Sequence, residues 1–200
     1  MDTNNLQKWT INSSKYLVND KFMKLRLDSC TTPQGGTVDK YYVIEYNDWV
    51  NCLAIDTDNN VITLRHYRHG VQSYLSELVA GGIEPEDASP EAAARRELEE
   101  ETGYTGGTLY NVGISYPNPA SQTNKLYSFL AVGGSLTHEQ NLEVGESLAV
   151  EKVPFQTFLS QVYAPGAIQQ SLHIATVFFA LSFIRNSSEP SVRELKKLLM

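Results

Sequence analysis

Residues 96–104, a segment that reads RELEEETGY, contain four glutamates, three of which are spaced to lie close together on a helix. An α-helix turns by about 100° per residue, so the side chains of Glu97, Glu100 and Glu101 would fall within roughly one third of its circumference. Like charges at these spacings repel by roughly a few tenths of a kcal/mol per pair, so the cluster favours bound cations. Hard, oxygen-seeking ions such as Mg²⁺ or Mn²⁺ prefer carboxylate ligands. The pattern therefore indicates a divalent-metal site on a helix.

The residues on either side of this cluster predict where the helix begins and ends. Ser89 is a suitable N-cap, and Pro90 fits the first helical position, where a missing N–H costs nothing. The three alanines at 92–94 favour a helix, and Gly103 can adopt the left-handed conformation that ends it.

A solvated helix face is the alternative interpretation of the acidic run, with Arg95 paired to Glu99 and Arg96 to Glu100. The longer pattern favours the metal site. The segment that starts at Gly82 resembles the Nudix box, G-x5-E-x7-R-E-U-x-E-E-x-G-U, in which U is a bulky apolar residue. Eight of the nine specified positions match, namely Gly82, Arg96, Glu97, Leu98, Glu100, Glu101, Gly103 and Tyr104.

The ninth position departs from the pattern. Ala88 stands where the family has its first glutamate, with Asp87 directly before it. In the family that glutamate precedes the helix and is less central to metal binding than the later three. The resemblance therefore implies that catalysis is retained and that metal affinity is weakened.

The resemblance also implies a role for each residue of the box. Members of the family hold divalent ions through the later glutamates and often through a backbone carbonyl before a second glycine, here that of Ala80 or Gly81. Arg96 is expected on the opposite side of the acidic arc, where it orients the glutamates by ion pairing. The expected metal ligands are Glu97, Glu100, Glu101 and Ala80, with Mg²⁺ or Mn²⁺ as the cofactor. Glu100 is also expected to take part in catalysis, and the structural positions are Gly82, Arg96 and Gly103.

Residues 1–47 resemble the N-terminal sheet of ADP-ribose pyrophosphatases, a branch of the Nudix family. Short β-strands are predicted at 16–18, 22–27 and 40–46 from alternation of apolar residues and from the turn residues between them. In that branch a similar sheet is commonly exchanged between the subunits of a homodimer, so a homodimer is expected. Trp9 could stack on an adenine, and the alternative is that it only anchors the terminus.

Two further positions resemble substrate contacts of this branch. Arg68 ends an HYR run at the place where the family has an arginine near the substrate diphosphate. Its planar fork suits phosphate oxygens. Pro119 stands fifteen residues after Tyr104, a spacing found in members that act on ADP-ribose. A surface arginine without a role and an ordinary loop proline are the alternatives.

The segment 142–150, LEVGESLAV, resembles an acidic loop of bacterial ADP-ribose and sugar-nucleotide hydrolases. In that branch the second glutamate, here Glu146, reaches the active site as a base or as an additional metal ligand. Glu143 is the neighbour that could replace it. An acidic surface loop without a catalytic role is the alternative.

The composition is that of an acidic globular protein. The 200 residues are 42% hydrophobic and 20% charged, and the formal net charge of −7 argues against nucleic acid or an anionic membrane as a partner. The longest apolar run, 174–184, is too short to span a bilayer. Cys30 and Cys52 lack metal-ligand spacing and no signal-peptide pattern is present, so we expect reduced thiols in a cytoplasmic protein.

Short strands alternate with the glutamate-rich helix and with an apolar helix at 171–184, which predicts an α/β fold. We expect the Nudix fold, an α/β/α sandwich around a mixed sheet, with a small N-terminal antiparallel β-sheet. The expected domains are a β-rich dimerisation unit at 1–47 and a hydrolase domain at 48–200.

The resemblance implies metal-dependent hydrolysis of the phosphoanhydride in ADP-ribose or an NDP-sugar, a small nucleotide substrate. The products would be a nucleoside monophosphate and a sugar phosphate. Two alternatives stay open. One is a Nudix hydrolase of another nucleotide, such as a dinucleoside polyphosphate or an oxidised nucleotide, and the other is a non-catalytic module that binds nucleotide sugars.

Overall fold

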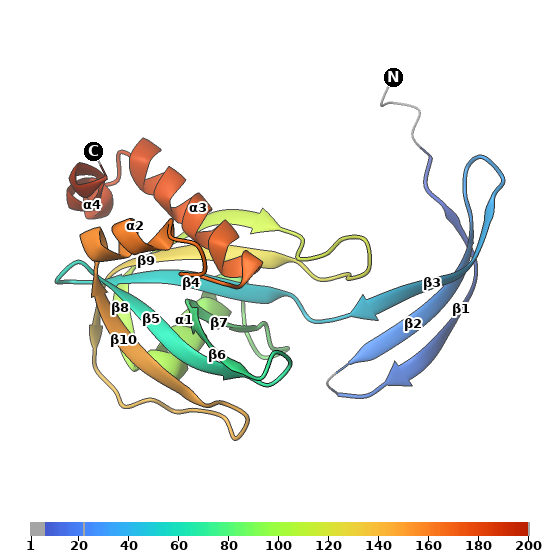
Figure 1. Ribbon diagram of the computed structural model, residues 1–200, viewed down its shortest axis with the longest axis horizontal. Helices are drawn as coiled ribbons and strands as arrows, with labels where there is room; N and C mark the ends of the chain where they lie inside the picture. The colour runs from blue at the N-terminus through green and yellow to red at the C-terminus, as the bar shows by residue number, and fades with distance from the viewer. Residues whose placement is uncertain (1–6, 22, 200) are drawn as a thin grey trace. The chain divides into compact units, whose positions relative to one another are not determined.

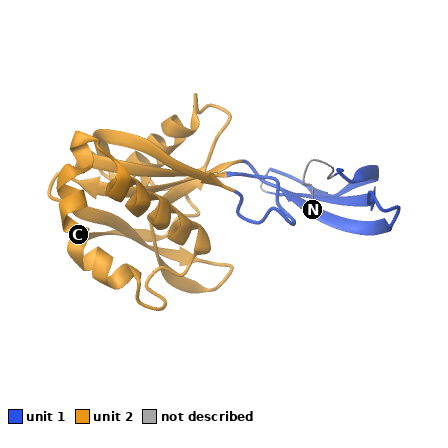
Figure 2. Ribbon diagram, turned by 90° about the horizontal axis from the view of Figure 1, so that it is seen from above, with its two compact units in different colours: residues 1–47, 116–125 blue, residues 48–115, 126–200 orange. Residues whose placement is uncertain are grey.

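The computed structural model describes residues 7–21 and 23–199, and the contacts among them divide the chain into two units (Figure 2). The first unit holds the chain up to Asn47 together with the loop 116–125, and the second holds the remainder. The expected hydrolase domain at 48–200 included this later loop. Phe22, with which the second predicted strand begins, lies outside the described residues.

The first unit is a three-stranded antiparallel sheet in the order β1-β2-β3 (Figure 1). Its strands are longer than the sequence pattern predicts: β1 (Thr10–Asn19), β2 (Lys24–Thr31) and β3 (Thr37–Glu45). The loop 116–125 belongs to this unit because it is hydrogen-bonded to β3. The backbone N–H of Ile44 donates to the carbonyl of Ser121 at 2.7 Å, and the Tyr41 hydroxyl donates to the carbonyl of Ala120.

The second unit is built on a seven-stranded mixed sheet. Its main order is β10-β5-β4-β9-β8, with β6 beside β5 and β7 beside β4. The pair β4 and β9 is parallel and the other pairs are antiparallel. The strands are β4 (Trp49–Asp56), β5 (Asn60–Arg68), β6 (Ser73–Glu77), β7 (Val79–Gly82), β8 (Tyr104–Ser115), β9 (Leu126–Leu136) and β10 (Leu148–Pro154).

Helices cover both faces of this sheet, as the predicted α/β/α sandwich requires (Figure 1). Along β4 the side chains alternate: Val50, Cys52 and Ala54 pack in the core with α1 (Pro90–Thr102), while Leu53 and Ile55 pack with the helices on the other face. Those helices are α2 (Phe155–Val162), α3 (Ser171–Asn186) and α4 (Arg193–Leu198). A strand whose two faces are both covered is apolar on both, so β4 shows a continuous buried run.

Helix α1 begins and ends at the predicted residues. The hydroxyl of Ser89 accepts the N–H of Ala92 at 3.2 Å, and Pro90 is the first helical residue. Gly103 ends the helix at φ +71°, where its N–H donates to the carbonyl of Glu99 at 2.7 Å. A Cβ at this position would lie 2.0 Å from the carbonyl oxygen of His138, so the site requires glycine for both its conformation and its space.

Both cysteines are buried free thiols, and burial raises the pKa of Cys52 to about 12. Among the described residues, no helix combines the length and the apolar character that a membrane crossing needs.

Candidate active site

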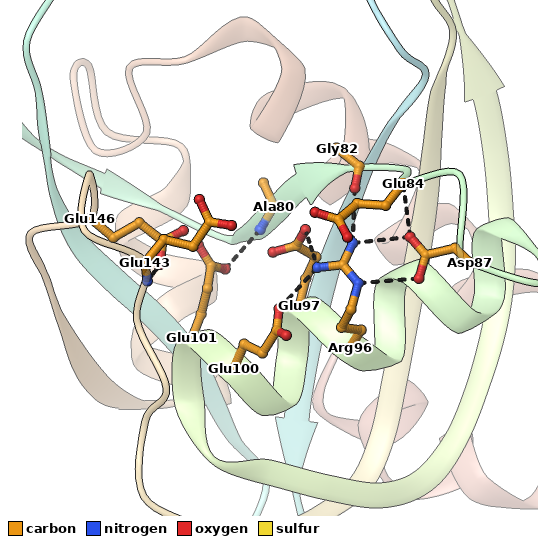
Figure 3. Close-up of polar contacts among 10 residues, drawn as sticks. All are labelled: Ala80, Gly82, Glu84, Asp87, Arg96, Glu97, Glu100, Glu101, Glu143 and Glu146. Carbon is orange, nitrogen blue, oxygen red and sulfur yellow. Dashed lines mark hydrogen bonds and ion pairs between the residues drawn. The ribbon is translucent and has the colours of Figure 1, made fainter. Parts of the chain in front are cut away.

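Helix α1 and strand β7 bring the glutamates against a stretch of backbone (Figure 3). Glu101 is buried, and its Oε2 accepts the backbone N–H of Ala80 at 3.0 Å. Glu97 lies against Gly81 so closely that a Cβ there would be 2.0 Å from Glu97 Oε1. The glycine therefore admits a carboxylate that any side chain at this position would displace.

Two of the box glutamates resist ionisation. Burial, together with the charge of neighbouring carboxylates including Glu146, raises the pKa of Glu97 to about 7 and that of Glu101 to about 9. Their ionised forms lack a compensating positive charge, and a hard divalent cation would supply that charge.

Arg96 lies at the edge of the cluster away from Glu101, where it contacts Glu97 and Glu100 (Figure 3). Its Nη1 is 2.9 Å from both Glu97 Oε1 and Glu100 Oε2, and its Nη2 donates to the carbonyl of Gly82 at 3.0 Å. The expected ion pairing with glutamates is present. The other edge of the guanidinium group faces residues that precede the helix, namely Asp87 and the carbonyl of Gly82. Arg95 donates instead to the carbonyl of Gly106.

Asp87 holds that other edge of Arg96. Its two carboxylate oxygens lie 3.1 Å from Arg96 Nε and 3.0 Å from Nη2, and Oδ2 also accepts the N–H of Glu84 at 2.8 Å. The hydrogen bonds from Arg96 lower the pKa of Asp87, and those to Asp87 raise the pKa of Arg96. Ala88, at the position of the missing glutamate, is exposed.

The carboxylates suit a divalent ion by their chemistry, although they do not close into a metal-ligand cluster. Within residues 7–21 and 23–199, no three His, Cys, Asp or Glu side chains are arranged to hold a metal ion as they stand. Glu97 and Glu100 each give one oxygen to Arg96, and Glu101 gives one to Ala80. Two buried carboxylates with raised pKa values remain next to one another. This donor set fits Mg²⁺ or Mn²⁺, and the identity of the ligands stays a prediction.

Arg68 ends β5 beside this cluster, and Glu77 fixes its side chain. Arg68 Nε is 2.9 Å from Glu77 Oε1, and Nη2 is 2.6 Å from Oε2, which makes a two-pronged ion pair. Glu77 is only 1% exposed. Arg68 and the backbone of the Ala80–Gly82 segment line a cavity of about 270 Å³, whose other lining residues are Trp49, Asn51, Gln170 and Leu172.

Sequence reasoning did not point to Glu77. The available signal was an acidic residue next to the apolar run Leu78–Val79, in a segment that must pair with the strand carrying Arg68. The pairing register, with Leu64 opposite Glu77 and Arg68 opposite Ser73, puts the two residues on the same face four pairs apart, and the long side chain of Arg68 reaches Glu77 along that face.

The loop before β10 presents Glu146 to the cluster. The N–H of Glu143 donates to Glu146 Oε2 at 2.9 Å, and the N–H of Glu146 donates to the carbonyl of Glu143 at 3.0 Å. Glu143 is exposed, whereas Glu146 is half-buried and its charge raises the pKa values of Glu97 and Glu101. In Figure 3 both loop glutamates lie on the Glu101 side of the cluster.

Two predicted substrate contacts, Trp9 and Pro119, belong to the first unit, whereas the other predicted site residues belong to the second. Within the first unit Trp9 is 48% exposed and makes an edge contact with the ring of Tyr41, with centroids 5.8 Å apart.

Comparison with known proteins gives two family matches and several relatives. A family described as NUDIX domain matches residues 46–171, and one described as Nucleoside diphosphate sugar hydrolase N-terminal domain matches residues 9–44. An ADP-ribose pyrophosphatase of Bacillus subtilis (strain 168) is 28% identical over 158 residues, which cover 78% of this chain and 84% of that protein. An ADP-sugar pyrophosphatase of Mus musculus is 32% identical over 136 residues, which cover 65% of this chain and 62% of that protein.

A crystal structure described as ADP compounds hydrolase has the same fold. It superposes with a TM-score of 0.80 at 21% sequence identity and covers 92% of this chain and 97% of its own. The NUDIX match covers more than half of the chain and includes helix α1 with its glutamates. The chain therefore belongs to the NUDIX domain family and is an enzyme, a hydrolase of the Nudix pyrophosphatase type.

Proposed function

We propose that this hydrolase cleaves the phosphoanhydride bond of ADP-ribose or a similar nucleoside diphosphate sugar, with Mg²⁺ or Mn²⁺ as its cofactor. The products are a nucleoside monophosphate and a sugar phosphate. The observation that carries this proposal is the cavity in which Arg68, fixed by Glu77, shares a wall with Ala80 next to buried Glu101. An anchored guanidinium beside an acidic metal-binding helix is suited to a diphosphate.

The relatives favour a diphosphate that joins a nucleoside to a sugar. Both curated relatives described above carry names for hydrolysis of ADP-ribose or ADP-sugars. The N-terminal match is to a domain of nucleoside diphosphate sugar hydrolases. These names support the substrate class and leave the base and the sugar to experiment.

Each residue of the site has a part in the proposed reaction. A divalent ion held by Glu97, Glu100, Glu101 and the carbonyl of Ala80 would neutralise diphosphate charge and lower the pKa of a bound water. Arg96 keeps Glu97 and Glu100 oriented through its two 2.9 Å contacts. Arg68 binds a phosphate oxygen.

Glu146 is the proposed general base. It takes a proton from water as the oxygen attacks phosphorus, and the bond to the bridging oxygen breaks with its electron pair leaving on the departing phosphate. Its half-buried position and its influence on Glu97 and Glu101 favour it over exposed Glu143. Glu100, whose side chain is 35% exposed and therefore accessible to water, is the second candidate.

We also propose that the first unit forms a homodimer through its sheet. This unit is one antiparallel sheet, and β1 is exposed along nearly its whole length. A single sheet with apolar side chains open to water gains stability by packing on a second surface, and an identical subunit is the partner that the sequence resemblance implies. Among the described residues of this unit, the large exposed apolar side chains are Trp9, Ile11, Tyr16, Leu17, Tyr42 and Tyr116. Trp9 is the proposed adenine-stacking residue.

The decisive experiment is a substrate panel with identified products. Purified protein is incubated with ADP-ribose, ADP-glucose, UDP-glucose, a dinucleoside polyphosphate and an oxidised nucleoside triphosphate, each with Mg²⁺ or Mn²⁺. We expect the highest kcat/KM for a nucleoside diphosphate sugar, with a nucleoside monophosphate and a sugar phosphate as products. A preference for the dinucleoside or the oxidised nucleotide would replace the proposed substrate class. Binding of the sugar nucleotides without turnover would indicate a non-catalytic module.

A further inference from the structure

Helix α3 contacts the sheet through a buried histidine near its start. His173 is completely buried, and its Nδ1 lies 3.2 Å from Nδ2 of Asn51 on β4. An amide nitrogen can only donate, so Nδ1 is the acceptor and the ring proton is on Nε2. One turn later the hydroxyl of Thr176 meets that of Ser128 on β9 at 2.9 Å. These polar contacts hold the beginning of α3 in one register on the sheet.

The proton-bearing Nε2 of His173 faces Glu77. It lies 3.6 Å from Glu77 Oε2 and makes no hydrogen bond within the part of the chain that the structure describes. This separation exceeds the usual N–H···O range of about 2.7–3.2 Å, so the contact is electrostatic. A buried N–H without a full hydrogen bond costs roughly 1–3 kcal/mol, and here its polar neighbour is a carboxylate.

Glu77 is therefore approached from several sides. Arg68 takes both oxygens with Nε and Nη2, His173 Nε2 faces Oε2, and Nδ1 of His66 on β5 lies 3.7 Å from the same oxygen. Burial would raise the pKa of Glu77, but the N–H groups of His173 and Arg68 outweigh it, and that pKa lies at about 2. Burial, followed by the charge of Arg68, lowers the pKa of His66. Glu77 is thus an ionised carboxylate with Arg68 as its counter-ion.

The two histidines differ in how they reach Arg68. His66 is on the same strand as Arg68, two residues before it, so its replacement disturbs that strand directly. His173 comes from a separate helix, and the polar group that it faces is Glu77. A carboxylate that rotates about its last bond loses the two-pronged pairing with arginine. An N–H directed at Oε2 opposes that rotation.

We propose that His173 is a positioning residue for the diphosphate: it fixes the carboxylate of Glu77, and Glu77 fixes the fork of Arg68 at the cavity where the diphosphate binds. This inference rests on the proposed function for the identity of the ligand. The paired fork uses Nε and Nη2 of Arg68, which leaves Nη1 for a phosphate oxygen. Because arginine side chains otherwise sample many rotamers, holding the fork in place reduces the entropy lost on binding.

The test compares two replacements of His173. His173→Leu removes the N–H and keeps an apolar group of moderate size, whereas His173→Gln keeps an amide N–H near the position of Nε2. With ADP-ribose we expect His173→Leu to raise KM about tenfold, which corresponds to about 1.4 kcal/mol, with kcat within about twofold of the parent. His173→Gln should recover most of that loss. Thermal melting of each variant reports separately on any purely structural effect.

A double-mutant cycle identifies the route of the effect. In an Arg68→Ala background His173→Leu should raise KM no further, because the residue on which it acts is gone. An additional tenfold rise in that background would overturn the proposal, as would an unchanged KM in a folded His173→Leu variant. If His173→Leu does not fold, His173→Phe provides a second replacement without an N–H and is judged by the same criteria.

Titration with inorganic pyrophosphate separates this inference from the proposed function. The probe contains the diphosphate alone, so its binding in the presence of Mg²⁺ does not depend on which nucleotide is the substrate. We expect His173→Leu to weaken pyrophosphate binding about tenfold even if ADP-ribose is not hydrolysed. Equal affinities of parent and variant overturn the role of His173, and a parent protein that does not bind pyrophosphate overturns the assignment of the cavity.

Discussion

Asp87 holds Arg96 along one edge of the guanidinium group, with carboxylate oxygens 3.1 Å from Nε and 3.0 Å from Nη2. Arg96 in turn contacts Glu97 and Glu100 through Nη1. Asp87 directly precedes position 88, where the sequence departs from the box pattern. Its carboxylate therefore orients the acidic cluster through Arg96. Ala88, which occupies the position itself, is exposed.

This pairing changes what we expect from variants at position 88. The sequence alone predicts that Ala88 weakens metal affinity and that Ala88→Glu lowers the metal concentration for half-maximal rate. With Asp87 already on Arg96, we expect Ala88→Glu to change that concentration by less than about twofold. Asp87→Ala should lower kcat by about tenfold and destabilise the fold by about 1–3 kcal/mol, because it leaves a half-buried guanidinium partly unpaired.

The double variant Asp87→Ala, Ala88→Glu is the matched control. If a carboxylate one residue later can take over the contact with Arg96, part of the lost activity returns. Mg²⁺ titration of the rate and thermal melting measure these effects. Parent-like activity of Asp87→Ala, or a clearly reduced Mg²⁺ requirement of Ala88→Glu, would show that Asp87 does not fill this role.

Glu101→Gln should reduce turnover by several orders of magnitude and leave the fold intact. The amide keeps the shape of the side chain and its oxygen can still accept the N–H of Ala80, but it removes a charged oxygen donor. Steady-state kinetics with ADP-ribose and Mg²⁺ measure the loss, and circular dichroism checks the fold. A variant that hydrolyses its substrate at nearly the parent rate would refute the assignment of Glu101 as a metal ligand.

The metal-free protein should lose stability as the pH rises from about 5 to about 9. The pKa values of Glu97 and Glu101 in the folded protein, about 7 and about 9, lie above the ordinary value for glutamate of 4.5. The folded state therefore binds more protons in this window, and its advantage disappears as each carboxyl ionises. We expect the melting temperature in EDTA to fall by a few degrees, at about 2–4 °C for each kcal/mol lost.

Two controls locate the origin of that pH dependence. Glu101→Gln should flatten the part of the profile between about pH 7 and 9, because its side chain cannot ionise there. Added Mg²⁺ should restore the parent melting temperature at high pH, because an ion that binds the ionised carboxylates stabilises the folded state. A parent profile that does not fall between pH 5 and 9 in EDTA would contradict the raised pKa values.

The two glutamates of the loop before β10 should differ in effect. Glu146→Gln is expected to lower kcat by about 100-fold or more with little change in KM, because a general base acts in the transition state. Glu143→Gln is the matched control and should change kcat by less than about threefold, since its backbone N–H, and not its carboxylate, contacts Glu146. The reverse ranking would transfer the role of base to Glu143.

Trp9→Ala should weaken binding of the adenosine end of the substrate. Stacking of an aromatic side chain on a base contributes about 1–3 kcal/mol, so KM for ADP-ribose should rise about tenfold or more with a smaller change in kcat. Tyr163→Ala replaces an exposed aromatic residue of the second unit and serves as the control. Sedimentation of the parent protein tests the proposed dimer at the same time. A fully active monomer, or an unaltered KM for Trp9→Ala, argues against the arrangement.

Local signals made helix α1 predictable. Ser89, Pro90 and Gly103 act within a few residues of where they stand, so the bounds of the helix and the clustering of its glutamates follow from their spacing. The layered fold was also predictable, because apolar strands alternate with helices along the chain. The box pattern then supplied the family.

Contacts between distant segments could not be predicted in this way. Glu77 meets Arg68 because the register of two strands puts them on one face and the arginine side chain spans the distance. His173 meets Glu77 because a helix nearly 100 residues later in the chain packs on that sheet. The contacts of Arg96 with Asp87 and with the carbonyl of Gly82 were not predicted, because periodicity fixes where a side chain starts and not where a long one ends. The loop 116–125 joins the first unit through hydrogen bonds that no local pattern indicates.

The parallel pairing of β4 with β9 has a consequence for how the chain folds during synthesis. Trp49 pairs with Leu126, so the centre of the sheet joins segments that leave the ribosome far apart in time. Contacts of such large sequence separation form slowly, whereas the antiparallel hairpins of the first unit and helix α1 depend on near neighbours. The helix that carries the acidic cluster is therefore synthesised well before β9, against which part of its apolar face must pack. Until β9 emerges, the part of that face that packs on it stays exposed on the nascent chain.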